Sequence, residues 1–122
     1  MSYVWVFVGG GLGSICRFGI ARVLPVPDLA FPWPTFWANL LSCLLLGWLV
    51  GQKLQGDLSA TLGFLLMTGF CGGFSTFSTF SYEAFSLMED GRIELAFLYI
   101  AASMLTGLLC IYTGFKLSHF LA

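Results

Sequence analysis

The chain has 122 residues, of which 58% are hydrophobic and only 9% are charged, and its formal net charge is −1. Soluble domains carry roughly 25% charged residues, and a domain this small buries too little of its surface to hide so much apolar area. The composition therefore excludes an ordinary water-soluble fold and predicts one membrane domain over residues 1–122. The small net charge also argues against nucleic acid as a partner.

The apolar residues fall into stretches long enough to cross a bilayer as helices, which takes about 20 residues each. Four such stretches run over about residues 3–21, 35–51, 58–87 and 95–115. A loop with four prolines follows the first, and prolines end helices. Short polar turns, Gln52–Asp57 and Glu89–Arg92, separate the others. The sequence predicts an all-α membrane protein of four transmembrane helices.

The basic residues are balanced across the membrane. Four spans place Lys53 and Lys116 on one side, with Arg22 and Arg92 on the other. Positive-inside logic then favours neither orientation, so the chain is expected to insert both ways. Two opposite copies are expected to pair as an antiparallel homodimer. The alternative is that another feature of the chain sets a single orientation.

Glycine recurs in the spans in patterns that bring helices together. Three GxxxG patterns predict close helix packing and self-association: Gly9–Gly13, Gly47–Gly51 and Gly69–Gly73. In the third span, Gly72–Gly73 is followed by many hydroxyl residues, and both features weaken a helix. We therefore expect the third helix to be broken near Gly72–Gly73. A broken backbone at membrane depth must face protein or a watery cavity, where freed carbonyls commonly hold ions.

Polar residues inside the first three spans are candidate functional groups, because such residues are costly in a membrane. Arg17 either extends to the lipid headgroups or lines a watery entrance that attracts anions, with Glu83 as its candidate partner. Asn39 is the only asparagine, and Ser42 follows it one turn later on the same face. The amide of Asn39 either joins helices or donates hydrogen bonds along a pathway.

An aromatic stripe with interleaved hydroxyls follows the expected break. Phe77 and Phe80 lie one turn apart, and Ser78 stands between them. Such a stripe ordinarily packs in a core, but packing does not require the hydroxyls. The edge of an aromatic ring is electropositive and can face a small anion. On the fourth span, Tyr99 and Ser103 share a helical face and can supply hydroxyl donors.

The chain lacks the residues of a catalytic or metal-thiolate site. Its single histidine is His119, and its four cysteines are spread over the four spans without a CxxC pair. We therefore expect neither an enzyme nor a cysteine-bound metal.

Three segments together resemble the Fluc (CrcB) family of small fluoride channels. Gly69–Glu83, with the sequence GFCGGFSTFSTFSYE, is similar to the family's third-helix signature. Gly9–Phe18 resembles its first helix, which is rich in glycine and ends with arginine. Thr35–Leu40, followed by Gly47, resembles its second-helix asparagine motif. The resemblance covers essentially the whole chain.

The resemblance implies a multi-pass protein of the inner (plasma) membrane that exports fluoride and relieves fluoride toxicity. It also implies dual-topology homodimers with two parallel pores built from both subunits. Position by position, Phe77 and Phe80 match the pore-lining phenylalanines and Asn39 matches the pore asparagine. Tyr99 and Ser103 resemble the polar track of the family's fourth helix.

The resemblance further implies a vestibule and a bound cation. Arg17 resembles the vestibule arginine. Gly72 and Ser75 match positions whose backbone carbonyls hold a structural sodium ion at the dimer interface. The family usually has threonine in place of Ser75, and a backbone ligand tolerates that change.

Two other classes of protein stay open at this point. Small dual-topology multidrug exporters are similar in size, but they use a glutamate in the first span, which has no acidic residue here. A structural subunit of a larger membrane complex needs no soluble domain, but it has no need of polar groups patterned along the spans.

Overall fold

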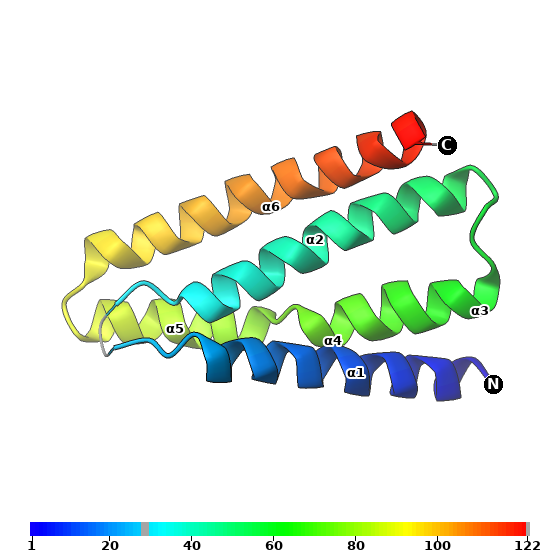
Figure 1. The fold of residues 1–122 in the computed structure, drawn as a ribbon. Coiled ribbons are helices and arrows are strands. Elements are labelled where there is room, and N and C mark those ends of the chain that lie inside the picture. Colours follow the sequence, from blue (N-terminus) through cyan, green and yellow to red (C-terminus); the bar gives the residue numbers. More distant parts are fainter. Residues whose placement is uncertain (28–29, 122) are drawn as a thin grey trace.

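The computed structural model describes residues 1–27 and 30–121, which are helical apart from short connections and termini (Figure 1). Residues 28–29, in the proline-rich loop, and residue 122 lie outside the described part of the predicted domain. The helices are α1 (Ser2–Val23), α2 (Trp33–Leu54), α3 (Ala60–Leu62), the π-helix η1 (Gly63–Cys71), α4 (Gly72–Phe74), α5 (Phe77–Glu89) and α6 (Ile93–Leu121).

These helices form four membrane spans within the described residues, which confirms the predicted architecture. By length and composition α1, α2, the run Ala60–Glu89 and α6 can each cross a bilayer. The third span is composite, since α3, η1, α4 and α5 follow one another along it. Three of the expected spans lie inside these helices, and the third, expected over residues 58–87, begins two residues before the helical run Ala60–Glu89.

Turn residues set the ends of the spans. Pro34 stands in the first turn of α2, where its missing N–H costs no helical hydrogen bond. Gly56 and Gly91 have φ angles of +79° and +80°, a left-handed conformation that strains any residue with a side chain. These turns return the chain so that both termini and the α2–α3 connection lie at one end of the bundle (Figure 1).

Glycines bring the helices into backbone contact inside the protomer. A Cβ atom on Gly13 would collide with the carbonyl of Phe70 in η1, and one on Gly73 would collide with the carbonyl of Gly10. On the other side of the bundle, a Cβ on Gly47 would collide with Ile111 in α6. The GxxxG patterns thus confirm close packing, and they join helices of one copy. Their expected role in self-association stays a prediction.

The main cluster of buried apolar residues is small and lies where α2, α5 and α6 meet. It is built from Phe36, Ala84, Leu87, Ala96 and Tyr99. Most large apolar side chains instead face outward, as a lipid solvent requires.

Candidate functional site

The third span is interrupted at two extended residues. Ser75 has φ −86° and ψ 157°, and Thr76 has φ −149° and ψ 124°, between the end of α4 and the start of α5. This confirms the break expected near Gly72–Gly73, although Gly72 is itself helical, with φ −63° and ψ −35°. The hydroxyl of Thr76 accepts a hydrogen bond from the N–H of Thr79 at 3.2 Å and so caps α5.

The interruption diverts two backbone donors from the carbonyls that they would meet in a continuous helix. The N–H of Thr76 would close a turn on Gly72, but it donates to Asn39 Oδ1 at 2.8 Å. The N–H of Thr79 would reach Ser75, but it donates to the Thr76 hydroxyl. The carbonyl oxygens of Gly72 and Ser75 therefore lose their helical donors and are available for another partner.

The side-chain amide of Asn39 holds the backbone of Thr76 through two hydrogen bonds. Its Oδ1 accepts from Thr76 N at 2.8 Å, and its Nδ2 donates to Thr76 O at 3.2 Å. The helix-joining role considered for this amide is therefore confirmed. An amide nitrogen carries two hydrogens, so the bond from Nδ2 to Thr76 O leaves one N–H of Asn39 for another acceptor.

A cavity of about 370 Å³ beside the break collects several of the predicted site residues. It is lined by Asn39, Cys43, Ser75, Thr76, Phe77, Phe80, Ser103 and Met104. The rings of Phe77 and Phe80 are 6.1 Å apart between centroids, and Phe77 is 80% exposed on the protomer. Ser103 Oγ is buried and has no hydrogen-bond partner within the described residues. An unpaired buried hydroxyl is costly, which makes Ser103 a candidate hydrogen-bond donor.

The structure places Ser78 and Tyr99 outside this cavity. Ser78 is exposed, and its hydroxyl lies 3.4 Å from that of Thr76. Tyr99 is completely buried, and its hydroxyl donates to Glu83 Oε1 at 2.9 Å. Only the ring of Tyr99 approaches the cavity wall, since it packs on Phe80 with centroids 4.9 Å apart.

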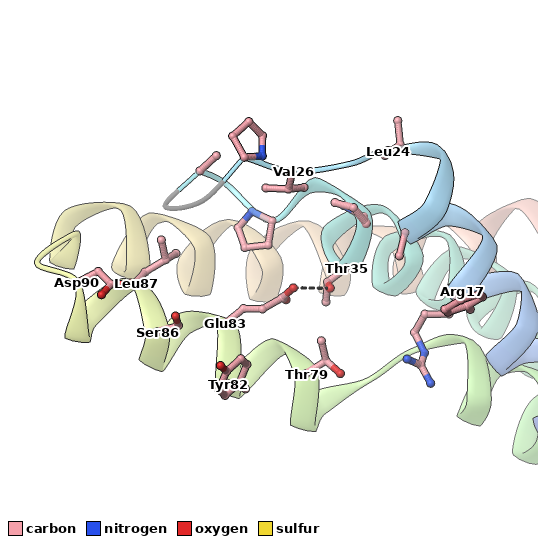
Figure 2. Close-up of a pocket in the computed structure, with 16 residues that line it drawn as sticks. Arg17, Leu24, Val26, Thr35, Thr79, Tyr82, Glu83, Ser86, Leu87 and Asp90 are labelled. Atoms are coloured by element: carbon pink, nitrogen blue, oxygen red, sulfur yellow. Dashed lines mark hydrogen bonds between the residues drawn. The ribbon is translucent and has the colours of Figure 1, made fainter.

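A second cavity, of about 680 Å³, opens between α1, the start of α2 and α5 (Figure 2). Arg17 and Glu83 both line it, as a shared vestibule requires. Their partners differ, however: Arg17 Nε donates to Gly73 O at 3.1 Å, whereas Glu83 Oε2 accepts from the Thr35 hydroxyl at 3.1 Å. The expectation that Glu83 pairs with Arg17 is therefore wrong in the described part of the chain.

Two residues of the site were not found by sequence reasoning. The sequence could have indicated Thr76, because a threonine directly before an apolar helical run is a typical N-cap. It gave no such indication of Thr35, since its partner Glu83 lies 48 residues away in the sequence.

A four-span membrane protein with an interrupted helix and polar groups gathered at the interruption has the build of a small channel or transporter. The chain belongs to the CrcB family: the family described as CrcB-like protein, Camphor Resistance (CrcB), matches residues 4–115.

Curated relatives match along nearly their whole length. A protein of Pyrococcus horikoshii is 46% identical over 115 residues, which is 93% of each chain. One of Chlorobium phaeobacteroides is 43% identical over 114 residues, covering 93% of this chain and 89% of its own. One of Thermus thermophilus is 39% identical over 116 residues, covering 94% and 91%. Each is named a fluoride-specific ion channel, FluC.

Proposed function

We propose that the protein is a fluoride-specific ion channel, not an enzyme, through which fluoride leaves the cell and its toxicity is relieved. The names of the relatives support this function. The observation that carries it in this chain is the cavity at the helix break. There Asn39, Phe77, Phe80 and Ser103 line one cavity, and the hydroxyl of Ser103 has no hydrogen-bond partner within the described residues.

The chemistry of this cavity suits a small, strongly hydrated anion. A pore must replace the water around fluoride with donors at close range, yet bind weakly enough for the ion to leave. The hydroxyl of Ser103 and the free N–H of Asn39 are such donors. The edges of Phe77 and Phe80 add a modest electropositive surface. Chloride is larger, and the two rings narrow the path against it.

The remaining predicted pore residues take part at other points of the path. Ser78 is exposed on α5 and can donate to an ion outside the cavity. Tyr99 acts through Glu83, because its hydroxyl is already committed there. The cavity that Arg17 and Glu83 line forms the vestibule. The guanidinium of Arg17 still has donors beyond Nε with which to attract anions.

The assembly is an antiparallel homodimer in a lipid bilayer. Phe77 supports this, because a ring that lines the cavity is 80% exposed in one copy and requires a cover. The balance of Lys53 and Lys116 against Arg22 and Arg92 supports opposite orientations. Each pore is then built from both copies.

A structural sodium ion binds where the two broken helices meet. The carbonyls of Gly72 and Ser75 fit it, because both have lost their helical donors to Asn39 and Thr76. Two copies would each supply these two oxygens, and carbonyl oxygen is a suitable ligand for a small hard cation. Such an ion holds the dimer together and takes no part in fluoride passage.

Fluoride leaves the cell passively across the inner (plasma) membrane. A negative interior drives an anion outward with about 2.3 kcal/mol per charge for each 100 mV.

The test is efflux of fluoride from liposomes that contain the purified protein, followed with a fluoride-selective electrode. We expect rapid passive efflux of fluoride and little efflux of chloride. A folded dimer that releases neither ion, or both at equal rates, would overturn the proposed function.

A further inference from the structure

Two side chains of α2 reach opposite sides of the break in the third span. Asn39 holds Thr76, directly before α5, through two hydrogen bonds of 2.8 and 3.2 Å. Ser42, one turn further along α2, donates to the carbonyl of Cys71 at 3.1 Å, in the last turn of η1. A continuous helix thus bridges a discontinuous one at the interruption.

The bond from Ser42 is not needed to satisfy its acceptor. The carbonyl of Cys71 also accepts from Ser75 N at 3.1 Å and from Ser75 Oγ at 2.8 Å. A carbonyl oxygen has two lone pairs, so the two donors from Ser75 already fill its capacity. What Ser42 adds is a connection between helices, and with 3% exposure that connection is shielded from water.

The connection bears on the cavity through Ser75. Ser75 is tied to the same carbonyl of Cys71, and it lines the cavity together with Phe77. A shift of the Cys71 turn away from α2 therefore moves Ser75 and changes the spacing of the cavity wall. Within the described residues, no other side-chain hydrogen bond joins α2 to η1.

We infer that Ser42 is a positioning residue. Together with Asn39 it fixes α2 to both sides of the break and so sets the width of the ion path. We call this pair of side chains the splint. This inference rests on the proposed function, because the width matters only if an ion passes. It assigns Ser42 no contact with the ion.

The test compares Ser42→Ala with a matched control in liposome efflux. Ser42→Ala is expected to assemble, to lose about three- to ten-fold of its fluoride flux, and to admit more chloride relative to fluoride. Ser42→Thr keeps the hydroxyl and is expected to restore selectivity. The control is Ser118→Ala: this serine has 0% exposure, but its hydroxyl donates to Phe115 O and accepts from Gln55 Nε2, both away from the break. It should keep wild-type selectivity.

A second measurement does not depend on conduction. Amide hydrogen exchange of residues 71–77 should be faster in Ser42→Ala than in the wild type and unchanged in Ser118→Ala. If Ser42→Ala showed the amide exchange rates and the ion selectivity of the wild type, the role inferred for Ser42 would be overturned. Equal loss of flux in both alanine variants with unchanged selectivity would also overturn it. A wild-type protein without any flux would instead count against the proposed function. The exchange measurement would still decide whether Ser42 holds the Cys71 turn against α2.

Discussion

The side-chain amide of Asn39 meets the backbone of Thr76 twice, with Oδ1 2.8 Å from the peptide nitrogen and Nδ2 3.2 Å from the carbonyl oxygen. Asn39→Asp keeps the acceptor, loses the donor and adds a negative charge beside the cavity. We expect thermal unfolding to show that the protein loses about 1–3 kcal/mol of stability. Fluoride efflux should fall sharply as well, because the carboxylate of Asp repels the anion. Efflux at the wild-type rate would show that Asn39 is remote from the ion.

Replacing Phe77 or Phe80 tests whether the aromatic stripe acts on the ion. Phe77→Ile and Phe80→Ile keep apolar bulk but remove the electropositive edge. Swaps that conserve volume usually cost less than about 1.5 kcal/mol, so the protein should still fold and assemble as the wild type does while fluoride efflux falls sharply. Phe85→Ile is the control, since this ring lies on α5, is 58% exposed and is absent from both cavities described above. Wild-type fluoride flux in both Phe77→Ile and Phe80→Ile would show that the two rings serve only to pack the protein.

The close contact of α1 with η1 predicts opposite results for two neighbouring glycines. A Cβ on Gly13 would collide with the backbone of Phe70, whereas a Cβ on Gly11 meets nothing within 4 Å. Gly13→Ala should destabilise the protein by about 1–3 kcal/mol or prevent folding, because overpacking displaces backbone. Gly11→Ala should leave the melting temperature unchanged or slightly raised. Equal melting temperatures for the two variants would contradict the helix contact described here.

The proposed antiparallel dimer predicts that a fixed orientation of the chain in the membrane removes function. Lysine in place of the exposed residues His119 and Phe120 gives one end of the bundle an excess of positive charge. This variant alone should insert in one orientation and show no efflux. Co-expression with a variant that carries Glu89→Lys and Glu94→Lys at the opposite end should restore efflux. Full activity from a population shown to lie in one orientation would contradict dual topology.

The proposed vestibule predicts an electrostatic effect on the capture of fluoride. Asp90 is exposed and lines the larger cavity, whereas its neighbour Glu89 is exposed but does not line it. Asp90→Asn should raise fluoride flux about two-fold at low ionic strength, because one unit charge some 10 Å away shifts the local anion concentration by about that factor.

The same effect should shrink as salt is added, since the Debye length falls from about 30 Å at 0.01 M to about 10 Å at 0.1 M. Glu89→Gln is the matched control and should change flux less. Equal responses to the two substitutions would mean that Asp90 does not face the path of the ion.

The sequence alone was sufficient for the architecture and the place of the break. Apolar length decides how many helices cross a bilayer, and this property is local to each stretch. The same holds for the break, because the two glycines and the following hydroxyls indicated an interruption near Gly72–Gly73, and it lies two residues further on, at Ser75 and Thr76. The motif from Gly69 to Glu83 was also sufficient to indicate the family that the comparisons confirmed.

Only the tertiary structure decided which polar groups meet. The bonds from Arg17 to Gly73, from Thr35 to Glu83 and from Asn39 to Thr76 span 56, 48 and 37 residues of sequence. The pairing expected between Arg17 and Glu83 was wrong for this reason, since charge alone suggested it. Such contacts depend on how the glycine faces let the helices approach and rotate against one another. A polar side chain buried in a membrane takes whichever partner that packing brings within reach, and the local sequence does not contain this information.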